Sequence, residues 1–273
     1  MPELAEVETV RNTLKKRILN KKVSDVVIIY DGVVKNDLDF FRKSLIGNEF
    51  CDILRIGKWL IFELNDYYLL SHLRMEGKYF IKNSNEPFAK HEHVIIRFCD
   101  NTDLRYHDVR KFGVIKIVKK EDLYNTEEIK KQGPEIISDN LTSEYLLEKF
   151  KKCRLPIKTA LLSQDIISGI GNIYADEILF ASFINPLKKA CFLTQDECEK
   201  IILNGRNILN KAIEEGGCTI RSYTSSLGVI GNYQNYLKVH KKEGEKCPNC
   251  GNVIKRIKVG GRSTYYCDKC QDN

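Results

Sequence analysis

The sequence lacks the features of a membrane-spanning or secreted chain. No apolar run approaches the roughly 20 residues that a helix needs to cross a bilayer. The first residues also lack the basic-then-apolar pattern of a secretory signal, and the chain contains no internal repeat or low-complexity tract. We therefore expect a globular protein in a reducing cytosol, with 273 residues to form two modest domains and a small appendage.

The chain carries a mild excess of positive charge, which by itself is a weak indication of nucleic-acid binding. Its formal net charge is +7 and its isoelectric point is about 8.8. The excess is concentrated near the C-terminus, where the residues from Lys238 onward include nine Lys or Arg and four Asp or Glu. This distribution favours an anionic partner for the C-terminal part of the chain.

Two hydrophobic patterns divide the chain. Leu4, Val7, Val10, Leu14 and Ile18 recur at helical spacing and predict an N-terminal helix. The next region contains short segments rich in β-branched and aromatic residues: VSDVVIIY, CDILRIGKWLIFEL, YYLLSHLRMEGKYFIK, HVIIRF and LRYHDVRKFGVIKIV. Because no helix-length pattern separates these segments, they predict an antiparallel sandwich or barrel.

Helical patterns replace the strand patterns after Gly133-Pro134. They predict helices in TSEYLLEKFKK, in NIYADEILFASF and in QDECEKIILNGRNILNKAIEEGG, the last of which stops at Gly216-Gly217. The polar stretch RSYTSSLGVIGNYQ has no clear periodicity. Its length and its glycine and serine content predict a mobile functional loop at residues 218–236.

Ten cysteines need an explanation in a reducing compartment, and four of them form a regular pattern. The other six are scattered and are interpreted as small apolar residues. The regular four have the spacing of a zinc site, namely Cys247-x2-Cys250-x16-Cys267-x2-Cys270. Four thiolates leave no open coordination position, so we expect one structural Zn²⁺. Two disulfides are the alternative.

The residues between the two cysteine pairs predict a β-hairpin with a basic and aromatic surface. Its exposed candidates are Lys255, Arg256, Lys258, Arg262, Tyr265 and Tyr266. Such a surface suits the phosphate backbone of a nucleic acid. A zinc ribbon can equally contact another protein, so the motif alone leaves both partners open.

The first residues can carry chemistry as well as start a helix. If Met1 is removed, Pro2 presents a secondary amine, and an α-amine titrates at roughly 7.7–8.0. The helix dipole disfavours a cation at this position, whereas Glu3 and Glu6 act in the opposite direction. An amine that attacks a sugar carbon forms a Schiff base, and a neighbouring Glu3 can move protons during the attack. The alternative is that proline and glutamate simply begin a helix well.

Four stretches together resemble the bacterial formamidopyrimidine-DNA glycosylase family: MPELAEVETV, DVRKFG, GIGNIYADE and KVGGRSTYYCDKCQ. They occur in the family's order and spacing, from one end of the chain to the other. The resemblance implies an α+β multidomain fold with an N-terminal helix on an antiparallel β-sandwich, a helix–two-turns–helix domain and a C-terminal zinc-finger β-hairpin. We expect these domains at residues 1–133, 134–236 and 237–273.

The resemblance also implies roles for individual residues in the removal of a damaged base. Pro2 matches the nucleophile that attacks C1′ of the damaged nucleotide, Glu3 matches the proton carrier, and Glu6 lies near the reaction centre. Lys58 matches a lysine assigned to β-elimination, and Arg262 matches an arginine linked to δ-elimination. Without the family, a lysine in an apolar segment such as RIGKWLIF is either a surface residue or a working one.

Base excision takes the damaged nucleotide out of the stack, so a wedge must fill the gap. Met75, Arg110 and Phe112 match the family's wedge, although Met75 and Phe112 would otherwise be interpreted as core residues. Contacts to the DNA are expected at five positions: His91, Arg110, Arg154, Lys158 and Asn172. Asn172 lies where a Gly-rich turn meets a helix start, which is a natural anion site.

The sequence departs from the family's pattern at two places. Ala5 stands where proline is usual, which loosens the first turn slightly. His240-Lys241 stands where a Tyr-Gly pair is usual, which we expect to change contacts at the domain junction while adding charge that favours phosphate. Neither departure touches the residues matched to the chemistry.

The expected protein is a monomeric, bifunctional DNA glycosylase and abasic-site lyase of the cytoplasm, associated with the nucleoid. Its expected substrates are 8-oxoguanine and formamidopyrimidines in damaged double-stranded DNA, excised through a proline Schiff base with β,δ-elimination. One rival is the related endonuclease VIII type, which removes oxidised pyrimidines, but Leu4 and the Arg110-x-Phe112 wedge favour the purine enzyme. The other rival is a non-catalytic, zinc-dependent DNA-binding protein, which would need neither Pro2 nor Glu3.

Overall fold

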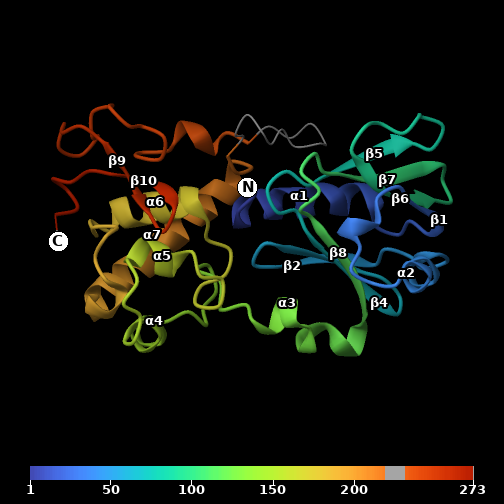
Figure 1. Ribbon diagram of the computed structural model, residues 1–273, viewed down its shortest axis with the longest axis horizontal. Coiled ribbons are helices and arrows are strands. Elements are labelled where there is room, and N and C mark those ends of the chain that lie inside the picture. Colours follow the sequence, from blue (N-terminus) through green and yellow to red (C-terminus); the bar gives the residue numbers. More distant parts are fainter. Residues whose placement is uncertain (219–230, 273) are drawn as a thin grey trace. The chain divides into compact units, whose positions relative to one another are not determined.

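The chain forms two compact units (Figure 1), and the computed structural model describes residues 1–218 and 231–272. The first unit consists of Met1–Lys130 with Gly216–Gly231, and the second of Lys131–Glu215 with Asn232–Asn273. Most of the loop predicted at residues 218–236 lies outside the described residues. At the far end of that loop, Tyr233–Asn235 forms the 3-10 helix η4 of the second unit.

The N-terminal helix forms where the apolar spacing predicts it. Helix α1 spans Leu4–Ile18. All five of the apolar residues used for the prediction are buried: Leu4, Val7, Val10, Leu14 and Ile18. Burying five such side chains stabilises the first unit by on the order of 10 kcal/mol, before the entropy of ordering the chain is subtracted.

Eight strands of the first unit form two antiparallel sheets of four strands each. One sheet has the order β1-β6-β7-β5, with β1 at Val23–Ile28, β5 at Lys78–Asn83, β6 at Glu92–Phe98 and β7 at Thr102–His107. The other has the order β2-β3-β4-β8, with β2 at Asp52–Ile56, β3 at Trp59–Glu63, β4 at Tyr67–His72 and β8 at Val114–Lys119. The predicted antiparallel sandwich is confirmed.

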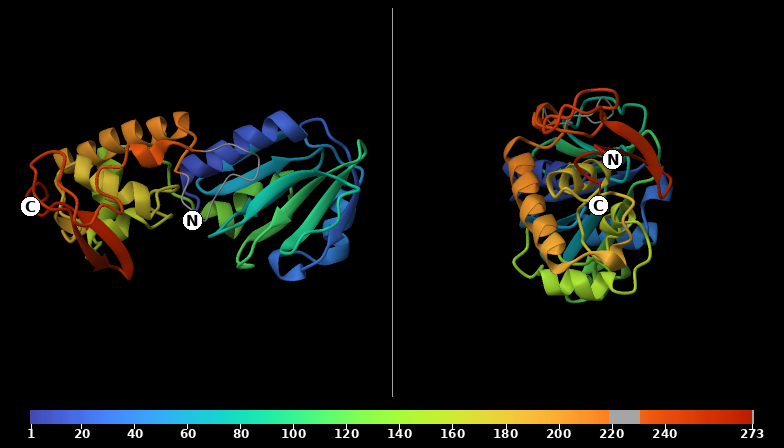
Figure 2. Two further views of the ribbon diagram at one scale, coloured as in Figure 1. Left: turned by 90° about the horizontal axis from the view of Figure 1, so that it is seen from above. Right: turned by 90° about the vertical axis from the view of Figure 1, so that its left-hand side faces the viewer.

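The core of the first unit lies between the two sheets, with α1 running alongside the strands (Figure 2). Inward-facing side chains of both sheets and the apolar face of α1 form one buried cluster. The outer face of the second sheet is covered as well, because Trp59 packs with Leu123 of η2 (Lys120–Asn125) and Ile129 of α3 (Glu127–Lys130). A sheet buried on both faces explains why β3 is apolar at nearly every position.

One helix of the first unit contradicts the expectation that no helix separates the strand segments. Helix α2 spans Leu38–Leu45, between β1 and β2. Asp37 caps it by accepting a hydrogen bond from the backbone N–H of Phe40 at 2.9 Å. Leu38, Phe41 and Leu45 do stand at helical spacing, but the pattern covers only eight residues, fewer than the roughly 10–12 that usually distinguish a helix from a strand in a sequence.

The second unit is helical, as predicted. Its helices are α4 at Ser143–Phe150, α5 at Ile157–Leu161, α6 at Asn172–Ala181 and α7 at Gln195–Glu214, with the 3-10 helix η3 at Ala190–Phe192. Thr142 and Thr194 cap α4 and α7 through their side chains. Gly216 and Gly217 end α7 with φ angles of +74° and +76°, which glycine adopts without strain.

The predicted hairpin is also present in the second unit, as β9 (Lys255–Val259) and β10 (Arg262–Tyr266). Phe180 of α6 packs with Val239 and with two of the motif's cysteines, Cys247 and Cys267. Gln271 donates a hydrogen bond from its side chain to the carbonyl of Ile184 at 2.8 Å. These contacts fix the hairpin to the helices of its own unit.

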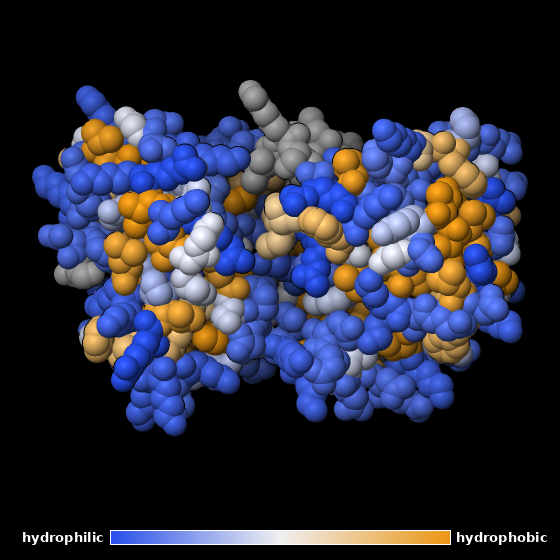
Figure 3. Space-filling model, viewed as in Figure 1, coloured by the Kyte–Doolittle hydropathy of each residue, from blue (hydrophilic) through white to orange (hydrophobic). Residues whose placement is uncertain are grey.

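The protein presents a polar surface in the view of Figure 3, where hydrophobic residues form separate small patches among hydrophilic ones. Scattered exposed apolar residues of this kind are normal for a globular protein. In the part of the chain that the structure describes, no helix is both long and apolar enough to cross a membrane.

Candidate functional site

The N-terminal turn holds the first candidate residues in a buried position. Pro2 and Glu3 are buried, whereas Met1 is exposed. The carboxylate of Glu6 accepts two hydrogen bonds at 2.8 Å, one from the N–H of Glu3 and one from the N–H of Cys218. Glu6 therefore fixes the first turn of α1 against the segment that contains Cys218.

Gly217 shows how closely that segment approaches Glu6. Its φ of +76° is strained for any other residue, and an added Cβ would lie 2.8 Å from Oε1 of Glu6. A larger residue at this position would push the segment away from the start of α1. The sequence pattern identifies Gly217 only as a helix stop, so this second role becomes visible only in three dimensions.

Lys58 lies in the two-residue turn between β2 and β3, where Ile56 pairs with Trp59. Gly57 has φ +57°, which suits the first central position of a type II′ turn, and Lys58 occupies the second. Only 4% of Lys58 is exposed. The interpretation of Lys58 as a surface residue is therefore wrong, and a buried lysine is a better candidate for chemistry.

Arg55 connects the Lys58 turn with α1. Its guanidinium donates one hydrogen bond to the carbonyl of Gly57 at 2.9 Å and another to the carboxylate of Glu8 at 2.7 Å. Both charged side chains are largely buried. Because the bridge is shielded from water, it holds the turn that carries Lys58 in a fixed position relative to the helix that begins at Leu4.

His72 is a candidate residue that the sequence does not indicate. Burial, together with the positive charges of Arg74 and Lys58, lowers the pKa of His72 from 6.5 to about 3. Its Nδ1 accepts a hydrogen bond from the N–H of Arg74 at 3.0 Å, so the neutral ring carries its proton on Nε2. A histidine with so perturbed a pKa, close to a candidate lysine, is typical of a functional site.

The three candidate wedge residues lie on two neighbouring loops of the first unit. Met75 is in the loop between β4 and β5, and Arg110 and Phe112 are in the loop between β7 and β8. Strand β4 pairs with β8, and β5 pairs with β7, up to the residues that flank the loops. Pairing of strands that are distant in the sequence thus brings both loops to the same end of the sandwich.

The hydroxyl of Tyr106 lies between these two loops. A Cβ added at Gly77, in the first loop, or at Gly113, in the second, would overlap the Tyr106 hydroxyl oxygen. Asp108 is fully buried and accepts backbone hydrogen bonds from Arg110 at 3.0 Å and from Gly113 at 2.8 Å. Backbone contacts therefore shape the second loop and leave its side chains available.

The candidate wedge side chains are exposed. Met75 is 37% exposed and Phe112 is 55% exposed, so their interpretation as core residues is wrong. The guanidinium carbon of Arg110 lies 4.8 Å from the centre of the Phe112 ring, which is a cation–π distance. Apolar side chains that stand out from rigid loops are suited to enter a base stack.

Three residues in and near these loops have a backbone conformation that favours glycine. Arg74, His91 and Lys111 have φ angles of +52°, +70° and +58°. Each such residue costs about 1–3 kcal/mol, and strain of this kind gathers at functional sites. Arg74 precedes Met75, and the carbonyl of His91 accepts a hydrogen bond from the N–H of Asp108 at 3.0 Å.

In the second unit, Asn172 and Arg262 are neighbours because the hairpin packs on α6. The side chain of Asn172 donates a hydrogen bond to the carbonyl of Ser263 at 2.9 Å. Arg262 directly precedes Ser263 and is exposed. The hairpin turn is also held at Gly260, where an added Cβ would lie 2.7 Å from the hydroxyl of Thr159.

The structure contradicts the phosphate contact expected of Lys158. This side chain is fully buried, at 0% exposed. Its ammonium donates to the carboxylate of Asp176 at 2.5 Å and to the carbonyl of Asn172 at 2.8 Å. A buried ammonium that is paired with a buried carboxylate cannot reach a phosphate on the surface, so Lys158 instead holds the start of α6.

Arg154 is exposed, as a phosphate contact requires. It lines a hollow in the surface together with Lys151, Lys152 and Lys189, beside the exposed ring of Phe192. Four cations around one hollow create a positive potential that attracts an anionic partner. Lys189 is far from the other three in the sequence, so the sequence alone does not reveal this group.

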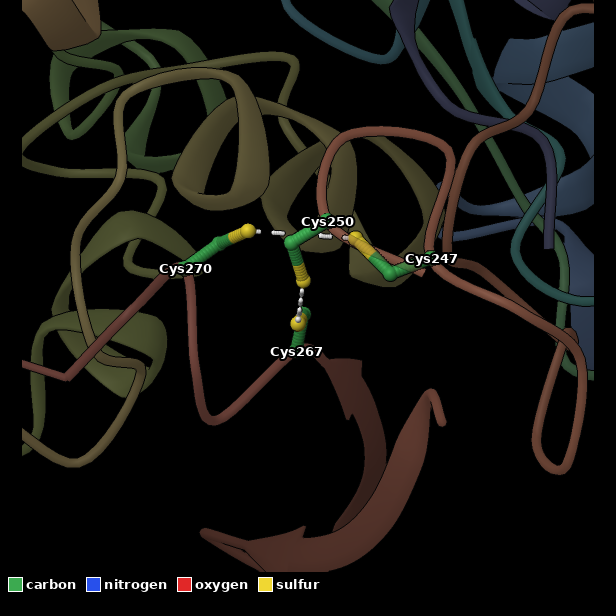
Figure 4. A group of neighbouring side chains, drawn as sticks. All are labelled: Cys247, Cys250, Cys267 and Cys270. Carbon is green, nitrogen blue, oxygen red and sulfur yellow. Dashed lines mark hydrogen bonds between the residues drawn. The ribbon is translucent and has the colours of Figure 1, made fainter. Parts of the chain in front are cut away.

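The four cysteines of the zinc motif point toward a common centre (Figure 4). Their sulfur atoms lie within 4.8 Å of one another, at 3.8 Å for Cys247 and Cys270 and 3.5 Å for Cys250 and Cys267. A tetrahedron with Zn–S bonds of about 2.3 Å needs sulfur atoms about 3.8 Å apart, whereas a disulfide needs about 2.05 Å. The group fits one structural Zn²⁺ and does not fit two disulfides.

Family models match the chain in three consecutive segments. Residues 1–115 match the formamidopyrimidine-DNA glycosylase N-terminal domain, and residues 132–224 match the H2TH domain of the same family. Residues 244–273 match the zinc finger found in FPG and IleRS. Together with the geometry of the two units, these matches define the class of protein as a DNA glycosylase with an H2TH domain and a zinc finger.

Full-length relatives agree with these matches. A formamidopyrimidine-DNA glycosylase of Bacillus anthracis is 43% identical over 273 residues, with 99% of each chain covered. The solved complex of Lactococcus lactis Fpg with abasic-site DNA has a TM-score of 0.93 at 39% identity, covering 99% of this chain and 100% of that one. A structure of MutM with DNA that contains carbocyclic 8-oxo-G has a TM-score of 0.93 at 40% identity, with 100% of each chain covered. The chain belongs to the formamidopyrimidine-DNA glycosylase family, which confirms the resemblance of the four motifs.

Proposed function

We propose that this chain excises 8-oxoguanine and formamidopyrimidines from double-stranded DNA and cleaves the resulting abasic site. The observation that carries the proposal is the full-length similarity to family members whose solved complexes contain abasic-site or 8-oxo-G DNA. We also propose that it acts as a monomer, in the cytoplasm and on nucleoid DNA. We further propose three domains: the catalytic sandwich at residues 1–133, the H2TH domain at residues 134–236 and the zinc finger at residues 237–273.

Pro2 supplies the nucleophile in this proposal once Met1 has been removed. Its secondary amine bonds to C1′ of the damaged nucleotide, the bond between C1′ and the base breaks, and the base leaves with a proton. Opening of the sugar then gives a cationic iminium that joins Pro2 to the DNA. Glu3, the next residue and also buried, moves the protons in these steps.

Lys58 and Arg262 serve the two eliminations that follow. Lys58 assists the β-elimination, which removes a proton from the sugar and breaks its 3′ phosphate bond. Its support is its burial in a turn that Arg55 anchors to α1. Arg262 assists the δ-elimination at the 5′ phosphate, and its exposed position beside Asn172 is suited to that phosphate.

The wedge and the phosphate contacts complete the proposal. Met75 and Phe112 fill the space that the damaged base leaves, while Arg110 bonds the base that has lost its partner. Arg110 has only donors, and cytosine offers two adjacent acceptors where adenine offers one. His91, Arg154 and Asn172 hold phosphates directly. Together with the basic hairpin, these residues would contact some four to five phosphates, so binding should weaken steeply with salt, with a log–log slope of roughly −4.

Borohydride trapping tests the chemistry and the substrate together. The protein should form a covalent adduct on an 8-oxoguanine duplex in the presence of borohydride, because borohydride reduces the iminium to a stable amine. A variant with one extra residue ahead of Pro2 should lose the adduct, since its proline nitrogen is part of a peptide bond. Glu3→Gln keeps the size of the side chain and removes its acid–base function, so this variant should form the adduct more slowly than the unmodified protein.

Other outcomes of the same experiment discriminate between the rival functions. A full adduct from the extended variant would remove Pro2 from the role of nucleophile. Stronger trapping on an oxidised pyrimidine than on 8-oxoguanine would favour the endonuclease VIII type. Tight binding of every duplex without any adduct or strand cleavage would favour the non-catalytic DNA-binding protein.

A further inference from the structure

A buried network in the second unit joins three ionisable side chains from three separate segments. Lys158 of α5 donates to Oδ1 of Asp176 in α6 at 2.5 Å. The other oxygen of Asp176 lies 2.7 Å from Nδ1 of His240. All three side chains are buried, with His240 at 5% exposed. His240 is one of the two places where the sequence departs from the family's pattern.

The network fixes where the imidazole of His240 carries its proton. Asp176 is paired with the Lys158 ammonium as a carboxylate, and a carboxylate only accepts hydrogen bonds. Nδ1 of His240 must therefore be the donor in its bond to Asp176. In a neutral ring the proton on Nδ1 leaves Nε2 with a lone pair and no hydrogen.

The ring is also fixed in position. The backbone N–H of His240 donates to the carboxylate of Glu177 at 2.8 Å, and the N–H groups of Lys238 and Val239 donate to the same carboxylate. The ring of Tyr265 lies edge-on to the imidazole, with 5.1 Å between ring centres. Nε2 has no hydrogen-bond partner within the described ranges and is not among the polar atoms sealed from water there.

The surroundings of this ring are suited to an anion. Asn172 at the start of α6 lies near the network, because its carbonyl accepts a hydrogen bond from Lys158. Its side chain holds β10 at Ser263. On the hairpin, the guanidinium carbon of Arg256 lies 6.0 Å from the centre of the Tyr265 ring. A helix N-terminus and a basic hairpin together favour a phosphate group.

We propose that His240 binds a phosphate of the DNA backbone through Nε2 and takes up one proton when it does so. The inference rests on the proposed function, since DNA supplies the phosphate. A phosphate oxygen only accepts hydrogen bonds, so it cannot bond to a bare Nε2. A proton from solvent must first join the Nε2 lone pair, which gives an imidazolium that donates to Asp176 on one side and to phosphate on the other.

The charged groups that face His240 determine how the added proton is accommodated. Lys158 and Asp176 offset each other, so the bound phosphate balances the new positive charge. Burial raises the pKa of Glu177, and three backbone N–H groups act in the opposite direction. Tyr265 contributes a ring edge, with Arg256 near the same ring.

DNA affinity measured against pH tests this inference. The probe is a duplex that contains a tetrahydrofuran abasic analogue, which the enzyme cannot cleave, at one fixed salt concentration. Between about pH 6 and pH 8.5, the dissociation constant should rise by up to about tenfold per pH unit where the proton is lost. His240→Gln should flatten this dependence, because the glutamine amide donates a hydrogen bond without taking up a proton.

His91→Gln is the matched control, because His91 is the other histidine proposed to hold a phosphate. The pH dependence should persist in His91→Gln and be lost in His240→Gln. Equal pH dependence in the unmodified protein and in His240→Gln would overturn the role of His240 while leaving DNA binding intact. Failure of the unmodified protein to bind the duplex at every pH would overturn the proposed function as well.

A measurement on the unmodified protein guards against a variant that fails to fold. Nitrogen-15 spectra of the imidazole should show a proton on Nδ1 alone in the free protein at about pH 8. Addition of the duplex should place a proton on both nitrogens of His240. A bare Nε2 in the complex at about pH 6 would contradict the proposal. Zinc content should be unchanged in His240→Gln, because His240 is not a zinc ligand.

Discussion

Acid should destabilise the first unit through His72. The pKa of His72 is about 3 in the folded protein, against 6.5 for an unperturbed histidine. Below about pH 6.5 the unfolded chain therefore binds a proton that the folded chain does not. The free energy of unfolding then falls as the pH falls, down to about pH 3. At about 1.4 kcal/mol per unit, the loss between pH 6.5 and pH 4.5 is about 2–3 kcal/mol.

Trp59 gives a local readout of this loss. It is the only tryptophan in the chain, and its ring centre lies 4.9 Å from that of His72. Urea titrations followed by tryptophan fluorescence at several pH values therefore report on the unit that contains His72. The free energy of unfolding extrapolated to zero urea should decrease steadily from about pH 6.5 to about pH 4.5.

His72→Asn separates the histidine from other groups that titrate in acid. The asparagine oxygen can accept the N–H of Arg74 as Nδ1 of His72 does, but it does not bind a proton. Carboxylates with lowered pKa values, such as Asp52 and Asp100, lose their contribution in both proteins at lower pH. The difference in stability between the two proteins should thus shrink by about 2–3 kcal/mol toward pH 4.5. A constant difference would refute the assignment to His72.

Four further changes have defined outcomes. Gly113→Ala should reduce the rate of base excision by more than it weakens DNA binding, because the new methyl group meets Tyr106 and displaces the wedge loop. A variant that excises as fast as the unmodified protein would show that the loop tolerates the shift. Lys158→Met should destabilise the second unit by about 3–5 kcal/mol in denaturant titrations, since Asp176 loses its buried partner; an unchanged stability with a shallower salt slope would restore the direct phosphate contact. Cys247→Ser should lower zinc content and DNA affinity while the fluorescence of Trp59 still shows a folded first unit; normal binding without metal would remove the hairpin from the DNA interface. Arg110→Ala should reduce the preference for excision opposite cytosine over adenine by about 1–3 kcal/mol in rate comparisons. An unchanged preference would show that a residue other than Arg110 recognises the partner base.

The sequence predicts those parts of the fold that depend on local patterns. The period of α1 and the spacing of the four cysteines are complete within short segments, so both are confirmed at the expected residues. The β9–β10 hairpin follows for the same reason. Helix α2 is missed although Leu38, Phe41 and Leu45 have helical spacing, because its eight residues are fewer than the roughly 10–12 that usually distinguish a helix from a strand.

The candidate site depends on contacts between distant segments, which no local pattern contains. Lys58 is buried in a turn that Arg55 connects to α1, and a single lysine in a sequence gives no sign of that bridge. The sequence does not distinguish Lys158 from a surface lysine near a turn, because its partner Asp176 is 18 residues away along the chain. His72 lacks a signal for the same reason, since burial and neighbouring charges determine its pKa.

The hydroxyl of Tyr106 restricts the sequences of both wedge loops, because it lies close to a glycine in each of them. A Cβ at Gly77 or at Gly113 would overlap that oxygen, so neither position can accept a side chain while the tyrosine remains. A substitution at Tyr106 would release Gly113, whereas a Cβ at Gly77 would still lie 2.6 Å from the backbone carbonyl oxygen of Leu73. Relatives that change Tyr106 should therefore vary at Gly113 and keep Gly77. Transfer of either loop into another scaffold would succeed only if the tyrosine and the second glycine were transferred with it.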